Sequence, residues 1–151
     1  MVLHKRLICS REFLTSSFDL FALKAHHKRL ALRFAIPEGL PRIFVDPFIL
    51  DRIFSCLVDR ALVVTPVGGV TVGAGSAFGR LLIAVEDEGP WVAPTDVSRL
   101  FAESSPDEAL RLAAHLARAV DGELVASSEG RRQGLCVTLT VPAKTLQSMM
   151  L

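Results

Sequence analysis

The stretch that decides the fold is LLIAVEDEGPW, residues 81–91, a short apolar run that leads into acidic residues and a Gly-Pro turn. Residues 81–85 are all apolar, which is typical of a central strand covered on both faces. Asp87 follows this run, and Gly89-Pro90 turns the chain away. The carboxylate is either part of a solvated acidic turn or part of a ligand site at a strand end, and this stretch alone leaves both open.

Composition indicates a single folded domain over residues 1–151, with a core at about 18–142 and loose ends at 1–14 and 144–151. Half of the residues are hydrophobic, 22% are charged, and the net charge is +1. This balance favours neither disorder nor a nucleic-acid or membrane surface. Three separated cysteines form no zinc pattern, and the N-terminal apolar run is too short for a signal peptide, so we expect a cytoplasmic protein.

The apolar periodicity on either side of this stretch predicts both helices and strands. Helices are expected at 18 to about 27 after a Ser16-Ser17 cap, at 47 to about 63 after Asp46, from 94, and at 107–121. Strands are expected at 30–36, 43–45, 69–75, 80–86, about 123–128 and 134–142, with hairpin turns at 73–79 and 129–134. The last helix should bury Ala109, Leu112, Ala113, Leu116, Ala117 and Val120.

Helices and strands do not alternate strictly, which favours an α+β fold over a parallel α/β fold. We expect a two-layer sandwich, with a mixed sheet of about five to six strands and three to four helices on one face.

From about Phe18 to Pro142 the chain resembles the ATP-binding catalytic domain of sensor histidine kinases, in the GHKL superfamily of Hsp90, DNA gyrase and MutL ATPases. Asp46-Pro47 with the helix ending in DRALVVTP (59–66) and GGVTV (68–72) resembles the segment that carries the family's asparagine box. VEDEGPW (85–91) resembles its DxGxG turn. LARAVDGELVASSEG (116–130) and GLCVTLTVPA (134–143) resemble its last helix and closing strands.

The residues that serve the nucleotide in this family are largely replaced. Cys56 and Arg60 stand at the two asparagine positions, and neither can replace an amide oxygen at Mg²⁺. Asp87 and Gly89 match the adenine-reading aspartate and its glycine, whereas Trp91 replaces the second glycine.

The phosphate-binding side differs as well. Residues 107–112, DEALRL, replace the family's second glycine motif and place two carboxylates at a helix N-terminus, where they would repel a triphosphate. Only residues 102–106 separate Phe101 from Asp107, too few for an ATP lid. The dimerisation hairpin and the phosphoacceptor histidine motif of the kinases are also not found in this sequence.

One interpretation is a degenerate, non-catalytic histidine-kinase-type domain, a pseudokinase that acts as a protein-interaction module of two-component or phosphorelay signalling. Its partner would be a response regulator or a phosphotransfer protein. It would have no catalytic residue, no metal and no cofactor, with at most weak ATP or ADP binding and no Mg²⁺. We then expect Trp91 to be buried in the base site, and Trp91 and Phe101 to line a groove between the two long helices.

The other interpretation is a nucleotide-binding domain of a sensor histidine kinase with atypical phosphate contacts. Its site would use Asp87, Gly89 and Trp91 around the base and Cys56, Arg60 and Arg111 around the phosphates, with guanidinium groups in place of Mg²⁺. If active, it would be an ATP-dependent histidine kinase.

Overall fold

The computed structural model describes residues 2–128 and 134–143, so the turn expected at 129–134 and the tail from 144 lie largely or wholly outside the described residues. The elements follow in the order β1 (Arg6–Ile8), α1 (Ser10–Ser16), α2 (Phe18–His27), β2 (Ala31–Ala35), β3 (Ile43–Val45), α3 (Pro47–Val64), β4 (Gly69–Ala77), β5 (Arg80–Asp87), α4 (Pro94–Val97), α5 (Glu108–Ala119), β6 (Glu123–Ser127) and β7 (Cys136–Pro142). No helix among these residues is both long and apolar enough to cross a bilayer.

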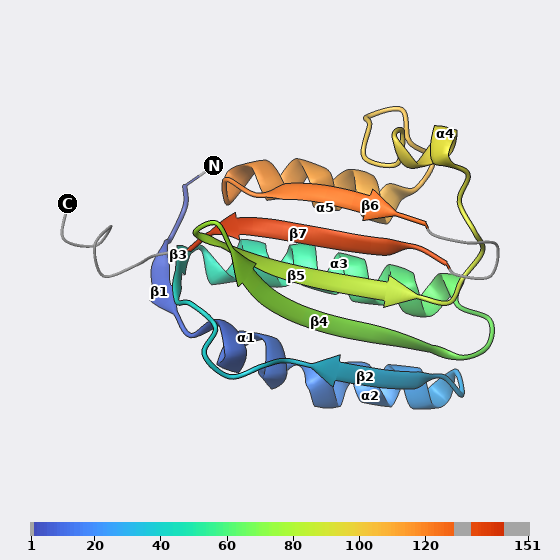
Figure 1. The fold of residues 1–151 in the computed structure, drawn as a ribbon, viewed down its shortest axis with the longest axis horizontal. Helices are drawn as coiled ribbons and strands as arrows, with labels where there is room; N and C mark the ends of the chain where they lie inside the picture. The colour runs from blue at the N-terminus through green and yellow to red at the C-terminus, as the bar shows by residue number, and fades with distance from the viewer. Residues whose placement is uncertain (1, 129–133, 144–151) are drawn as a thin grey trace.

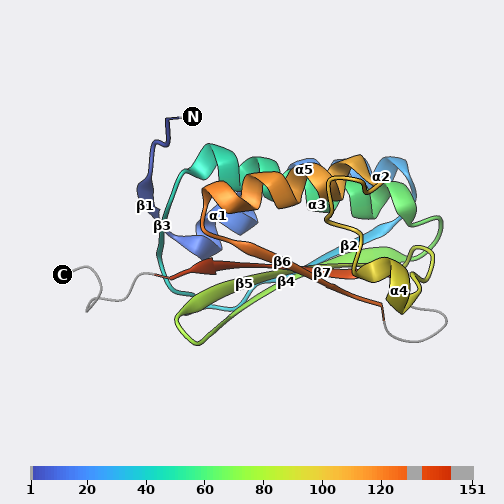
Figure 2. The same cartoon turned by 90° about the horizontal axis from the view of Figure 1, so that it is seen from above.

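The main sheet has five strands in the order β2-β4-β5-β7-β6. β2 and β4 are parallel, and the other neighbours are antiparallel. Helices α1, α2, α3 and α5 cover one face of this sheet, and among the described residues no helix covers the opposite face (Figures 1 and 2). The predicted α+β sandwich with a mixed sheet is confirmed. The short strands β1 and β3 pair with each other in a separate antiparallel ribbon.

The core lies between the helices and the covered face of the sheet. All six predicted core residues of α3 are buried: Leu50, Ile53, Phe54, Leu57, Val58 and Ala61. In β5, Leu81, Ile83 and Val85 are buried, but Leu82 and Ala84 are only half-buried on the open face. The expectation of a strand covered on both faces is therefore wrong, because helices pack on one side only.

Three local expectations also need correction. Residues 10–16, within the end expected to be loose, form α1, and Ser17 does not cap α2, because its hydroxyl donates to the Leu14 carbonyl instead. Helix α5 buries Leu110, Ala113 and Ala117, whereas Leu112 is exposed. The buried stripe is thus rotated toward Leu110, which faces the core where α5 packs on α3.

The β4–β5 hairpin is longer than predicted and closes with a two-residue turn at Phe78 and Gly79. Both residues have positive φ, 52° and 72°, as in a type I′ turn. The predicted hairpin is confirmed, and its turn projects from the sheet on the side away from the helices (Figure 2).

Candidate functional site

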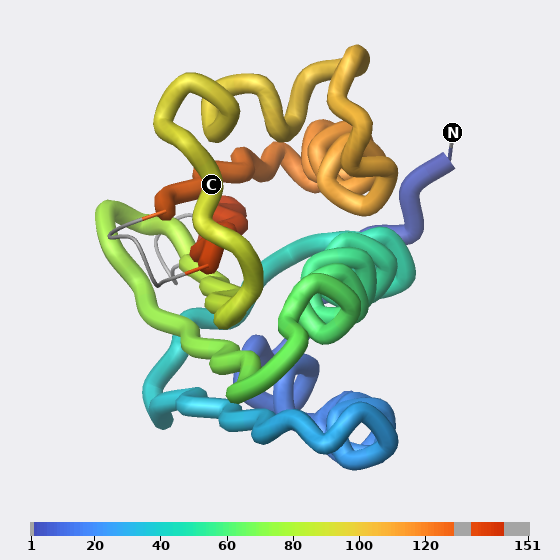
Figure 3. Tube along the Cα trace, turned by 90° about the vertical axis from the view of Figure 1, so that its right-hand side faces the viewer, coloured from blue at the N-terminus to red at the C-terminus, as the bar shows by residue number. Residues whose placement is uncertain are grey.

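The residues of the candidate site meet where β5 ends beside the C-terminal half of α3 and the start of α5. Helix α3 begins as predicted, with Pro47 in its first turn and the Asp46 carboxylate accepting the backbone N–H groups of Phe48 and Ile49 at 3.0 and 3.4 Å. The buried stripe of α3 sets the rotation of the helix, which leaves Cys56 and Arg60 on the side that faces the start of α5. The tube view along this end of the molecule shows α3 and α5 lying side by side (Figure 3).

Arg60 joins the three elements through one guanidinium group. Its Nη1 donates to Oδ2 of Asp87 at 2.9 Å, and its Nε donates to Oδ2 of Asp107 at 2.9 Å. The Arg60 side chain is 12% exposed and Asp87 is 3% exposed, so the Arg60–Asp87 pair is largely shielded from water. Asp107 also caps α5, because its Oδ1 accepts the Leu110 N–H at 3.0 Å. The bridge therefore fixes the start of α5 against the end of β5.

The second oxygen of Asp87 is held by the backbone. Oδ1 accepts the N–H groups of Gly89 at 2.8 Å and Leu135 at 3.2 Å. A Cβ on Gly134 would lie 2.1 Å from this oxygen, and a Cβ on Gly89 would lie 2.8 Å from the Val64 carbonyl. Both positions therefore require glycine. Both oxygens of Asp87 are engaged, so a ligand at Oδ2 would compete with Arg60 for that oxygen.

A groove of about 550 Å³ opens beside this bridge, between α3 and the start of α5. Cys56, Arg60, Val63 and Asp107 are among the residues that line it. Burial raises the pKa of the Cys56 thiol, which the nearby Arg52 partly opposes. The thiol is thus neutral at physiological pH and is neither an activated nucleophile nor a ready metal ligand.

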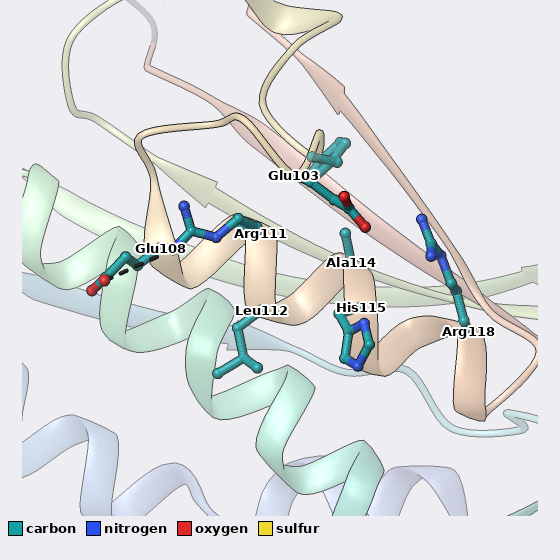
Figure 4. A pocket seen from close by; sticks show the side chains of 8 residues that line it. Glu103, Glu108, Arg111, Leu112, Ala114, His115 and Arg118 are labelled. Atoms are coloured by element: carbon teal, nitrogen blue, oxygen red, sulfur yellow. Dashed lines mark ion pairs between the residues drawn. The ribbon is translucent and has the colours of Figure 1, made fainter.

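Arg111 lies in a different cleft, of about 620 Å³, on the outer side of α5 (Figure 4). Its Nη1 donates to the Ser105 carbonyl at 2.8 Å, and its Nη2 lies 3.8 Å from Glu108. The cleft is lined by Phe101, Glu103, Glu108, Arg111, Leu112, Ala114, His115 and Arg118. The structure therefore does not bring Arg111 and Arg60 together.

The predictions for the two aromatic residues are wrong. Trp91 is 46% exposed and lines neither cleft, so it does not plug a base site. The bridging Arg60 and the close approach of Gly89 and Gly134 already fill the space around Asp87. Phe101 lines the cleft outside α5 and not the groove between α3 and α5.

Sequence reasoning found Asp87, Gly89 and Arg60 but missed Asp107 and Gly134 as their partners. Asp107 was predicted as a cap and as a repellent of phosphates, and it caps α5 as expected. No local signal in the sequence indicates the bridge, because Asp87 and Asp107 lie 27 and 47 residues from Arg60. Across residues 2–128 and 134–143 no group of His, Cys, Asp and Glu could hold a metal ion.

Comparison with known proteins defines the class of this domain. No family model matches the chain. It is 26% identical over 100 residues to the adaptive-response sensory kinase SasA of Synechocystis sp., covering 65% of this chain and 26% of the relative. It is 30% identical over 91 residues to the alginate biosynthesis sensor protein KinB of Pseudomonas aeruginosa, covering 60% and 15%. The chain thus spans roughly a quarter or less of these two relatives' lengths.

Solved structures agree with this relationship. Full-length ShkA in complex with AMPPNP superposes with a TM-score of 0.84 and 26% identity, covering 96% of this chain and 32% of ShkA. The nucleotide-free catalytic domain of histidine kinase ThkA superposes with a TM-score of 0.82 and 14% identity, covering 93% and 98%. The chain is therefore a GHKL-like domain of the histidine kinase ATPase type. Within that class, it is similar to the ATPase-type modules of sensor kinases.

Proposed function

We propose that this domain is a non-catalytic protein-interaction module of two-component or phosphorelay signalling, whose nucleotide site is closed by its own Arg60. The observation that carries the proposal is the bridge from Arg60 to Asp87 and Asp107 at 2.9 Å each. The resemblance assigns Asp87 to the adenine base, and here an internal guanidinium donates to that carboxylate.

We expect a nucleobase at Asp87 to displace Arg60 from this shielded ion pair. Separating the partners of a buried pair costs about 3–5 kcal/mol. At about 1.4 kcal/mol per tenfold change, that cost lowers the affinity for a nucleotide by roughly two to four orders of magnitude. The groove next to the bridge does not offset this loss, because Cys56 and Arg60 supply no amide oxygen there.

The residues of the site also do not fit a magnesium-bound triphosphate. Asp107 and Glu108 stand at the start of α5, where phosphates would need backbone N–H groups without competing carboxylates. Asp107 already uses the Leu110 N–H. We therefore derive no chemical step through ATP or Mg²⁺ and assign no catalytic residue.

The proposed partner is a response regulator or a phosphotransfer protein. ThkA in complex with the response regulator TrrA superposes on this chain with a TM-score of 0.83 and 15% identity, covering 95% of this chain and 43% of ThkA. The cleft outside α5 offers a surface for such a partner, since Arg118 and His115 are exposed and Leu112 is 38% exposed beside them. Arg60 is not part of that surface, because it is largely buried.

The test is a calorimetric titration of the chain with ATP and ADP, with and without Mg²⁺. We expect dissociation constants above about 1 mM that Mg²⁺ does not improve. We also expect no label from γ-labelled ATP on His26, His27 or His115. Arg60→Ala, which empties the bridge, should bind ADP more tightly than wild type, and Arg11→Ala, at an exposed position of α1 outside the groove, is the control. Micromolar, magnesium-dependent binding by wild type would overturn the proposal in favour of a working nucleotide domain.

A further inference from the structure

The connector that leads from α4 into α5 is held at one buried residue. Of residues 98–107, only Ser105 is buried, and its neighbours at 102–104 and 106 are exposed. The Ser105 carbonyl accepts Nη1 of Arg111 at 2.8 Å, and the Ser105 hydroxyl accepts the Asp107 N–H at 3.2 Å. Ser105 therefore ties the connector to a side chain one turn into α5 and to the residue that caps this helix.

These contacts continue to the carboxylate at the end of β5. Asp107 accepts Nε of Arg60 at 2.9 Å, and the same guanidinium donates to Asp87 at 2.9 Å. Hydrogen bonds thus lead from Arg111 through Ser105, Asp107 and Arg60 to Asp87. Arg111 and Arg60 lie in different clefts, but this chain of contacts connects them.

The connection matters at Asp107 because this residue stands at the start of a helix. The first N–H groups of a helix have no partner within it, and a helix end opens more easily than its centre. Asp107 is bound to α5 by the N–H groups of Leu110 and Arg111, each at 3.0 Å. Both bonds are lost when the first turn opens, and the carboxylate then leaves Arg60. By holding Ser105, the Arg111 side chain opposes this opening.

Arg111 is accessible to a partner, whereas Arg60 is not. The Arg111 side chain is 40% exposed in the cleft outside α5, where it lies beside Glu108 (Figure 4), and the Arg60 side chain is 12% exposed. Glu108 lies 3.8 Å from Nη2 of Arg111 and leaves Nη1 on Ser105. A guanidinium bonds more strongly to a carboxylate than to a neutral carbonyl. A carboxylate that reaches Nη1 from the cleft therefore competes with Ser105 for Arg111.

We propose that the cleft outside α5 controls the Arg60 bridge, and that Arg111 is the positioning residue through which it acts. An acidic side chain of a partner draws Arg111 away from the Ser105 carbonyl, the first turn of α5 opens more often, and Asp107 loses Arg60. The presence of a partner in this cleft rests on the proposed function. The coupling between Arg111 and Arg60 does not, and it can be measured in the isolated chain.

Amide hydrogen exchange, followed residue by residue by NMR, tests the first step. Arg111→Gln should speed the exchange of the Leu110 N–H about fivefold and leave that of Ala117, farther along α5, nearly unchanged. Arg118→Gln is the matched control, because Arg118 lines the same cleft and, within the described chain, has no hydrogen bond to the connector. Equal effects of the two substitutions on Leu110, or no effect of Arg111→Gln, overturn the proposal.

The Leu135 N–H reports on the far end of the chain of contacts, because it donates to Asp87. Arg111→Gln should speed its exchange about twofold, which opening of α5 alone would not do. Asp107→Asn keeps a capping side chain but removes the charge that Arg60 contacts. In that background the effect of Arg111→Gln on Leu135 should disappear, while its effect on Leu110 remains. An effect on Leu135 that persists with Asp107→Asn, or that is absent without it, overturns coupling through the bridge.

An acidic group can be placed in the cleft within the chain itself. His115 lies one turn after Arg111 and lines the same cleft (Figure 4), so His115→Glu brings a carboxylate within reach of Arg111, and His115→Gln is the uncharged control. We expect His115→Glu to speed Leu110 exchange roughly two- to threefold over His115→Gln. Equal rates overturn the role of an acidic group. No nucleotide takes part in these measurements, so their failure leaves the proposed function standing, and micromolar ADP binding would overturn that function without changing these rates.

Discussion

At the scale of single residues, Arg60 holds a position that no other cation of the described chain shares, between two carboxylates of different elements. Arg60→Met removes the guanidinium and leaves Asp87 charged and buried. We expect a loss of about 3 kcal/mol in the free energy of unfolding, measured by urea denaturation. Arg52→Met, at an exposed position, should change it by no more than about 0.5 kcal/mol.

A double variant distinguishes the ion pair from simple loss of packing. Arg60→Met with Asp87→Leu removes both charges, and it should recover part of the stability that Arg60→Met loses. If the double variant is less stable than the sum of both single changes, the pair is not the reason for the loss.

The single tryptophan reports on the same region. Because Trp91 is 46% exposed, its emission should be red-shifted, accessible to acrylamide and unchanged by ADP. The unfolded chain gives the limit of full exposure for comparison. Blue-shifted emission that resists quenching would contradict the position of this side chain.

Part of the site could be predicted from the sequence, and part could not. Asp87 and Gly89 follow a recognisable strand, so their place is readable locally. The two ion pairs of Arg60 span 27 and 47 residues, and spacing along the chain does not reveal them. The size of Trp91 suggests that its side chain is buried, but whether it can be buried beside Asp87 depends on whether Arg60 already occupies that space.

At the scale of elements, α3 depends on its first turn. The Asp46 carboxylate accepts the His4 N–H at 2.9 Å, and this hydrogen bond lowers the pKa of Asp46 below the ordinary 3.8. Burial opposes the shift, whereas the N–H groups of Ile49 and Phe48 lower the pKa further. A lowered folded-state pKa means that the carboxylate stabilises the fold above pH 3.8 and that this contribution is lost as the pH falls through the folded-state value.

Asp46→Asn should therefore lower the melting temperature at neutral pH, and the difference from wild type should shrink as the pH drops below about 4. Thermal unfolding followed by circular dichroism over a pH series measures this. Asp51→Asn, at an exposed position of the same helix, is the matched control. A difference that stays constant to low pH would argue against a role for the ionised carboxylate.

The elements themselves were predictable to different degrees for physical reasons. Asp46-Pro47 and a six-residue apolar stripe fix α3 from its start to within one residue of its end. Helix α1 is only seven residues long, and so short a helix carries little periodicity. The apolar run of β5 predicts the strand, but it does not reveal that only one face of the strand is covered. Leu82 and Ala84 are apolar, yet they lie on the open face beside small neighbours such as Thr138 and Thr140.

At the scale of the whole molecule, ten residues, 98–107, connect α4 to α5, and the proposed function gives this connector no role as a lid. Ser105 in this connector is buried, and its carbonyl accepts Arg111. We expect amide hydrogen exchange of residues 98–107 to stay the same when ATP and Mg²⁺ are added, because nothing closes. Arg60→Ala measured in parallel shows whether emptying the bridge creates a response. Protection of this segment by ATP in wild type would mean that a lid exists.

On the proposal that Arg60 closes the nucleotide site, the bridge also makes that closure difficult to reverse. Reopening the pocket requires removing Arg60, yet the first variant without it carries two neighbouring carboxylates with no cation between them. At about 3 kcal/mol, that step consumes a large share of the 5–15 kcal/mol that typically separates a folded domain from its unfolded chain. An amide at position 60 would benefit nucleotide binding only if glycines also replaced the carboxylates at the start of α5. Under this proposal, the substitution that would have to come first to open the site is one that also destabilises the fold.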